Sequence, residues 1–202
     1  MLFSMATPRP EPVQLHARAM DNLRYIRGTM ERAGSFTAVP GLGGVLMGSI
    51  ALVAAWMAGP QTGETRWLAV WTGAAVVAML IGIVAAAMKS RRLKQAVLSG
   101  PGRKFIAGFA PAMLAGAVLT VALSRTGANA ELPGIWLLLY GAAVVSGGGN
   151  SVRVVPLMGA CFMALGGAGL LFPVASGDIL LAAGFGGVHI IFGTIIAVKY
   201  GG

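Results

Sequence analysis

The sequence predicts an all-α integral membrane protein with six transmembrane helices, and three observations support this fold class. Apolar residues make up 56% of the chain and charged residues 10%, with a mean hydropathy of +0.80, whereas soluble domains carry about 25% charged residues. Six apolar stretches of about 20 residues, enough for a helix to cross a bilayer, follow one another along the chain. The basic residues also gather in alternate connections, as the positive-inside rule requires.

The chain is predicted to contain a leader and a membrane domain. Residues 1–38 are expected to form a cytoplasmic leader with an amphipathic helix, and residues 39–202 the six-helix transmembrane domain. The spans are predicted at about residues 40–59, 67–88, 105–124, 133–149, 154–173 and 179–198.

The distribution of Lys and Arg orients the chain. Thirteen of the 15 lie in the leader, in the second and fourth connections or after the last span, and only Arg66 and Arg125 fall on the other side. We therefore expect both termini to be cytoplasmic in a multi-pass protein of the cell inner (cytoplasmic) membrane. The net charge of +9 then suits the surface of the lipid bilayer and requires no nucleic-acid partner.

Residues 13–33 are predicted to form an amphipathic helix, because apolar residues recur there at steps of three and four. The apolar stripe and the arginines beside it include Leu15, Leu23, Ile26, Met30, Arg24 and Arg27. Such a helix lies on the membrane surface or against its own membrane domain, or it docks on a separate partner. The sequence leaves both alternatives open.

The six spans are predicted to form three tandem helical hairpins. Each odd span has a proline near its cytoplasmic end, followed by small residues: Pro40, Pro111 and Pro156. Proline is tolerated in a first helical turn because the amides there have no acceptor within the helix. A two-helix unit copied twice would give a parallel repeat, and six independent spans of similar composition are the alternative.

Small residues are candidates for helix packing. Helices in lipid associate through close backbone approach, which glycine and alanine permit. Gly44 and Gly48 form a small pair four residues apart in the first span, Ala160 and Ala164 occupy corresponding places in the fifth, and Gly193 is expected to permit close approach in the sixth.

His189 is the one ionisable side chain deep within a predicted span, because all six acids fall outside the spans. The lack of a mid-membrane carboxylate disfavours a proton-antiport mechanism. We expect His189 to face neighbouring helices, since an imidazole in hydrocarbon would leave its N–H unpaired. It is a candidate for an interhelical hydrogen bond, for contact with a pore or substrate, or for ligation of a tetrapyrrole metal.

A glycine run at the cytoplasmic end of the fourth span is a second candidate site. It comprises Ser146, Gly147, Gly148, Gly149 and Asn150, with Arg153 shortly after. Such a run can unwind and turn backbone groups toward an ion or anionic substrate. A flexible connector is the alternative interpretation.

The function remains divided between two classes. The sequence contains none of the acid, base, nucleophile or metal-cluster patterns that an enzyme requires, so we expect neither an enzyme nor a cofactor or metal. One hypothesis is a transporter- or channel-like protein for a neutral or weakly polar small solute. The other is a non-catalytic accessory, assembly or regulatory subunit of a larger membrane complex, and a homo-oligomer is compatible with both.

Overall fold

The computed structural model describes residues 18–26, 39–59, 63–92, 100–149, 151–172 and 176–200. The chain divides into two compact units, Met1–Gly34 and Ser35–Gly202. In the first unit residues 18–26 form an exposed helix, on which Arg24 lies 3.5 Å from Asp21 in an ion pair. This helix falls within the predicted range 13–33, and the rest of that range lies outside the described residues.

The second unit contains six helices that are long and apolar enough to cross a membrane, so the predicted fold class is confirmed for the described residues. The first five spans are α2 (Gly41–Ala58), α3 (Glu64–Arg92), α4 (Gly100–Thr126), α5 (Leu132–Gly148) and α6 (Val154–Leu171). The sixth span is one continuous helix, Gly177–Tyr200, made of α7 (Gly177–Leu181), a π-helical segment η2 (Ala182–Val188) and α8 (His189–Tyr200). A 3-10 turn, η1 (Asn129–Glu131), precedes α5.

The helices α3 and α4 extend beyond the spans predicted for them. Lys89, predicted to lie in a connection, belongs to α3, is 6% exposed, and donates a hydrogen bond of 3.0 Å from Nζ to the Val39 carbonyl oxygen. Hydropathy marks where a helix leaves hydrocarbon, but a helix continues into the interface when long basic side chains reach polar groups there.

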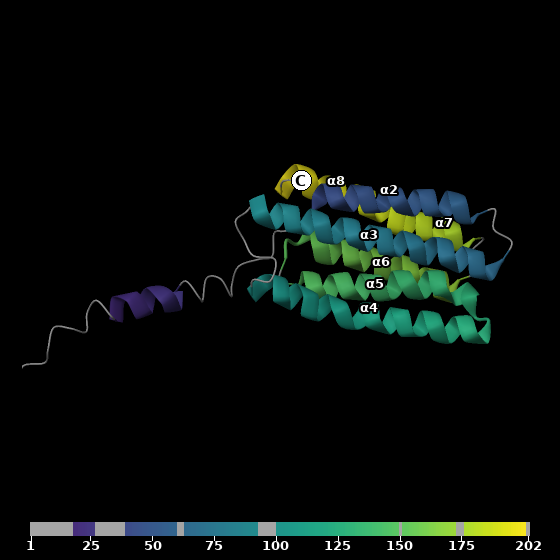
Figure 1. Cartoon of the computed structure of the whole chain (residues 1–202), viewed down its shortest axis with the longest axis horizontal. Coiled ribbons are helices and arrows are strands. Elements are labelled where there is room, and N and C mark those ends of the chain that lie inside the picture. Colours follow the sequence, from purple (N-terminus) through teal and green to yellow (C-terminus); the bar gives the residue numbers. More distant parts are fainter. Residues whose placement is uncertain are drawn as a thin grey trace, which may run out of the picture. The chain divides into compact units, whose positions relative to one another are not determined.

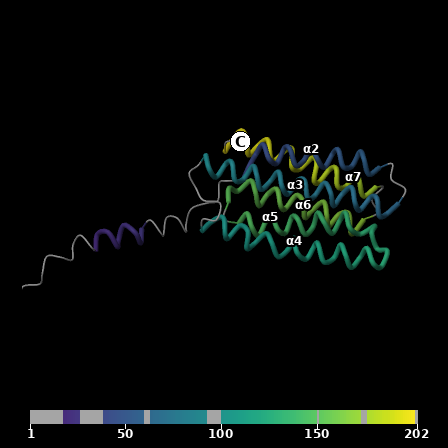
Figure 2. The backbone as a smooth tube through the Cα atoms, in the orientation of Figure 1, coloured from purple at the N-terminus to yellow at the C-terminus, as the bar shows by residue number. Residues whose placement is uncertain are grey.

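The six spans lie side by side with their axes roughly aligned (Figure 1). The chain trace in Figure 2 shows them running back and forth along one direction. Extensive contacts join α4 to α5, α5 to α6, α3 to α2, and α2 to α8, while the last span also contacts α5 and α6. Because α3 and α4 are not in extensive contact, the helices form a ring that is open between these two.

The two ends of the bundle differ in charge. The carboxylates Glu64, Glu131 and Asp178 lie where α3, α5 and α7 begin, and we call this the acidic end. The other end, which we call the basic end, carries Arg91, Arg92, Arg103, Lys104, Arg153 and Lys199. The separation of charge follows the predicted topology, and the cytoplasmic location of the basic end stays a prediction.

The three prolines occupy different places in their helices. Pro40 is the N-cap residue of α2 and Pro156 lies in the first turn of α6, but Pro111 lies well inside α4. Proline therefore does not mark the start of every odd span, because α4 begins earlier than its hydropathy indicated. The tandem repeat itself stays a prediction.

Glycines bring α5 and α6 into backbone contact. A Cβ atom built on Gly141 would lie 2.6 Å from the Gly159 carbonyl oxygen, and one on Gly166 would lie 2.7 Å from the Gly134 carbonyl oxygen. At such distances any side chain would force the helices apart, so these glycines set the spacing between α5 and α6.

The predicted packing residues fall into two groups. Gly44, Gly48 and Gly193 lie where α2 meets the last span, and a Cβ on Gly193 would lie 2.7 Å from the Val45 amide nitrogen. Ala160 and Ala164, in contrast, are exposed on α6, where Gly159 and Gly166 make the contact with α5, so the packing role of the two alanines stays a prediction. Spacing alone does not fix the rotation of a helix about its axis, and α6 turns its glycines rather than its alanines toward α5.

Candidate functional site

His189 and Tyr140 form a hydrogen-bonded pair about halfway along their spans. The Tyr140 hydroxyl oxygen lies 2.8 Å from His189 Nε2 and so joins α5 to the last span. His189 Nδ1 lies 2.9 Å from the carbonyl oxygen of Phe185, one turn earlier. Since a carbonyl only accepts hydrogen bonds, Nδ1 carries the proton and Nε2 accepts the proton of the Tyr140 hydroxyl.

His189 is 4% exposed, which confirms the expectation that it faces neighbouring helices. It directly follows the π-helical segment η2, in which the backbone is wider than in an α-helix. Both ring nitrogens have partners, so metal ligation through Nε2 would have to break the bond to Tyr140. Within the described residues, no group of three or more His, Cys, Asp or Glu side chains is placed to hold a metal ion.

Aromatic rings from three spans surround the pair. The Tyr140 ring makes edge-on contacts with Phe109 of α4, Phe162 of α6 and Phe185 of η2, at centroid distances of 5.8, 4.9 and 5.3 Å. The His189 ring centroid lies 5.0 Å from that of Phe162. Edge-on aromatic contacts are favourable beyond the apolar area that they bury. The cluster therefore fills the bundle interior and fixes how α4, α5, α6 and the last span pack.

The glycine run after Val145 stays helical and packs against α4. α5 continues to Gly148, and Gly147 and Gly148 are buried. A Cβ on Gly147 would lie 2.8 Å from the Phe105 carbonyl oxygen, which accounts for glycine at that position. Ser146 and Gly149 are exposed, as is Arg153 before α6, and Asn150 lies outside the described residues. The glycine run therefore stays helical as far as Gly148, contrary to the predicted unwinding. The structure does not bring this run together with His189.

A second polar cluster lies at the acidic end. One carboxylate oxygen of Asp178 accepts hydrogen bonds from the indole N–H groups of Trp67, at 2.7 Å, and Trp71, at 2.8 Å. The Trp67 ring stacks on Trp136 with a centroid distance of 5.6 Å, and Trp136 donates a hydrogen bond of 2.8 Å to Thr120. The cluster joins α3, α4, α5 and α7 at the acidic end.

The bonds of these tryptophans to Asp178 were not predicted from the sequence. One signal was present, because Trp67 and Trp71 are four residues apart and therefore lie on one face of a helix. Indole N–H groups need an acceptor where water is scarce. A carboxylate that lies at the same depth in the membrane as the two indoles supplies one.

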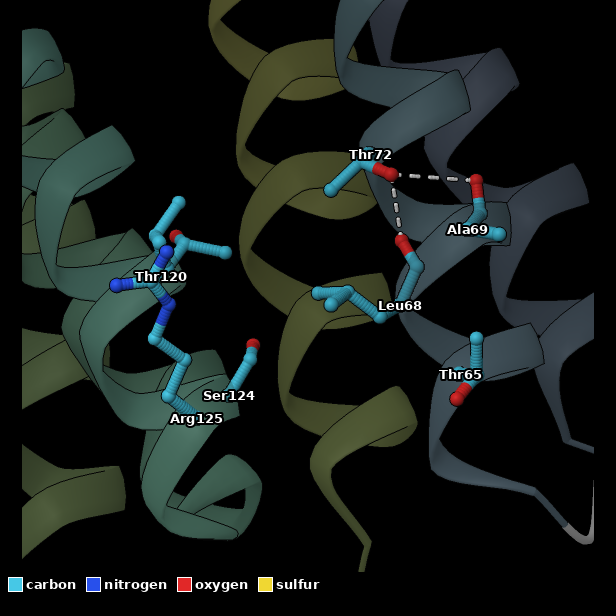
Figure 3. Close-up of a pocket in the computed structure, with 8 residues that line it drawn as sticks. Thr65, Leu68, Ala69, Thr72, Thr120, Ser124 and Arg125 are labelled. Carbon is cyan, nitrogen blue, oxygen red and sulfur yellow. Dashed lines mark hydrogen bonds between the residues drawn. The ribbon is translucent and has the colours of Figure 1, made fainter.

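A groove of about 490 Å³ lies between α3 and α4 near the acidic end. Figure 3 shows the two walls, with Thr65, Leu68 and Thr72 on α3 and Thr120, Ser124 and Arg125 on α4. Ala69 and Val121 complete its lining. The groove occupies the opening in the ring of helices, so it faces laterally, in the direction where lipid would surround the protein.

Comparison with known proteins finds no relative. No protein-family model matches the chain, and neither a curated protein nor a solved structure matches it. The fold defines the protein as a polytopic α-helical membrane protein.

Proposed function

We propose that the protein is a non-catalytic accessory or assembly subunit of a larger membrane complex. An exposed stripe of small side chains on α6 supports this role. Ala160, Ala164 and Ala168 follow at intervals of four residues and are all exposed. Because helices in lipid associate through close backbone approach, this stripe is suited to receive a helix of another chain.

Two glycines without close neighbours support the same interpretation. A Cβ built on Gly73, within α3, or on Gly167, beside the α6 stripe, would meet nothing within 4 Å. Glycine inside a helix costs about 1 kcal/mol relative to alanine unless close packing requires it. A neighbouring helix from a partner would supply that packing.

The filled interior supports assembly rather than conduction by a single copy. Phe162, Leu137 and Leu181 are each 0% exposed, and they belong to three different spans that meet around the Tyr140–His189 pair. A solute path through one copy would have to displace this layer of side chains.

Site-specific crosslinking in cells tests the proposal. A photoreactive amino acid at Ala164 should yield a discrete adduct with a different membrane protein. The same group at Val118 of α4, which is 67% exposed and belongs to neither proposed contact, should yield none. Ala164→Phe should shift the native complex to a smaller size, whereas Val118→Phe should not. An adduct of twice the chain's own mass, or no adduct from Ala164, would contradict a role in a mixed complex.

The alternative function, transport of a neutral or weakly polar solute, is supported by the lateral groove between α3 and α4. Liposomes containing the purified protein provide the comparison. If it is a transporter, light scattering should record uptake of small neutral solutes above the rate of protein-free liposomes, and Ala69→Phe in the groove should reduce it. If it is an accessory subunit, the two rates should be equal.

A further inference from the structure

We propose that the groove between α3 and α4 holds one phospholipid, with its phosphate against Arg125 and an acyl chain along Leu68 and Val121. The proposal is independent of the proposed function. It rests on the chemistry of the groove lining, on the position of the groove in the bundle, and on one buried hydroxyl without a partner.

The polarity of the groove changes along its length. Thr65, Ser124 and Arg125 lie near the ends of their helices, at the mouth of the groove. About two turns further in, the Thr72 hydroxyl donates to the Leu68 carbonyl oxygen at 2.6 Å (Figure 3). A threonine bonded to its own helix in this way presents mainly its methyl group to the groove.

The α4 wall follows the same order. The Thr120 hydroxyl donates to the Gly116 carbonyl oxygen at 2.7 Å and accepts the indole N–H of Trp136, so it is already satisfied. The Ser124 hydroxyl oxygen, one turn nearer the mouth, is buried and has no hydrogen-bond partner. A buried hydroxyl without a partner, one residue before an arginine that lines the same groove, is suited to donate to a phosphate oxygen. The groove is thus polar and cationic at its mouth and apolar deeper in, the order of groups in a phospholipid.

The surroundings also favour lipid as the occupant. α3 and α4 are the two spans least buried by the rest of the chain, and the groove opens sideways between them. At the acidic end, a hydrogen bond of 2.6 Å from Asn129 to Glu64 connects the start of α3 with the turn after α4. Phosphate groups lie at the boundary of the hydrocarbon, the depth at which spans end, so a lipid brings its charge to the level of Arg125.

Native mass spectrometry of the purified full-length protein tests the site. The protein would be stripped of lipid in detergent and titrated with phosphatidylglycerol, and the fraction carrying one bound lipid would be recorded. Arg125→Gln should weaken binding of the first lipid about tenfold, since it removes a charge-assisted contact. Arg66→Gln is the matched control, because Arg66 is also exposed near the acidic end but does not line the groove. It should change the affinity less than about twofold.

A second pair of variants tests the apolar part. Ala69→Phe fills the groove and should abolish binding of the first lipid. Val77→Phe places the same side chain on an exposed face of α3 that points away from the groove and should leave binding unchanged. The circular dichroism and melting temperature of each variant would be recorded. If a variant of one pair does not fold, the binding measured for the other pair tests the proposal.

Three outcomes would overturn the proposal. Equal lipid binding by the Arg125 and Arg66 variants would show that Arg125 does not contact the headgroup. Complete displacement of the lipid by millimolar glycerol phosphate would indicate a site for a free anion. Dimers that form in place of the lipid-bound monomer and are lost in Ala69→Phe would show that a second copy of the chain fills the groove.

Discussion

Substituting Gly166 by alanine should separate two helices that the structure holds in backbone contact. On α6, a Cβ at this position would contact the backbone of Leu138 and would lie 2.7 Å from the Gly134 carbonyl oxygen. Neither neighbour is the end of a flexible side chain, so the strain cannot be relieved by a rotamer change. The next residue, Gly167, has nothing within 4 Å of the same added atom and provides a matched control.

The expected magnitude follows from two opposing contributions. Replacing glycine by alanine inside a helix stabilises it by about 1 kcal/mol, and both variants share this term. Only Gly166→Ala adds a methyl group to a filled contact, and overpacking of this kind costs about 1–3 kcal/mol. The free energy of unfolding should therefore be about 1–3 kcal/mol lower for Gly166→Ala than for Gly167→Ala.

The measurement is reversible unfolding of the protein in mixed micelles, with increasing sodium dodecyl sulfate and helix content followed by circular dichroism. Comparing adjacent positions on one helix removes the effects of span hydrophobicity and of detergent. Equal unfolding free energies for the two variants would refute the reasoning that α5 and α6 touch through their backbones at Gly166.

Three other expectations concern the polar contacts and the topology. Tyr140→Phe should lower the free energy of unfolding by about 1–3 kcal/mol in the same unfolding assay, since it leaves the His189 nitrogen buried without a partner; no loss would mean that the two spans are held by ring packing alone. Asp178→Ala should destabilise by about 2 kcal/mol, as two indole N–H groups lose a charged acceptor, whereas Asp178→Asn should lose less, and equal losses would show that the charge contributes nothing. A cysteine at exposed Gly63 should react with an impermeant thiol reagent on intact cells and one at exposed Gly100 should not; the reverse pattern would invert the topology.

The number and order of the spans could be predicted because the length and hydropathy of a span are local properties. The end of α3 could not, because Lys89 finds its carbonyl partner at Val39, in the segment that precedes α2. The rotation of α6 about its axis was also hidden, since Gly159 and Ala160 are equally small and only contact with α5 distinguishes them.

The candidate site was predictable only in part. An imidazole within a hydrophobic span has to face other helices, so the orientation of His189 followed from the cost of an unpaired N–H group. Its partner Tyr140 lies 49 residues earlier, and no spacing rule connects the two. The lateral groove could not be foreseen either, because it lies between two helices, α3 and α4, that are not in extensive contact, and no residue pattern marks it.

The π-helical segment in the last span has a consequence for insertions and deletions. Successive residues of an α-helix are about 100° apart around the axis, so one residue more or fewer turns everything beyond it by that angle. The wide turn at Ala182–Val188 lets Asp178 meet the tryptophans of α3 while His189 still meets Tyr140. Removing Gly187, which has almost no close neighbour, would let this wide turn close to an ordinary α-helical turn, so that Asp178 and His189 keep their directions. The same deletion in α7 or α8 would turn the residues beyond it by about 100°. The π-helical segment is therefore the place at which this span can lose a residue without losing the contacts at its two halves.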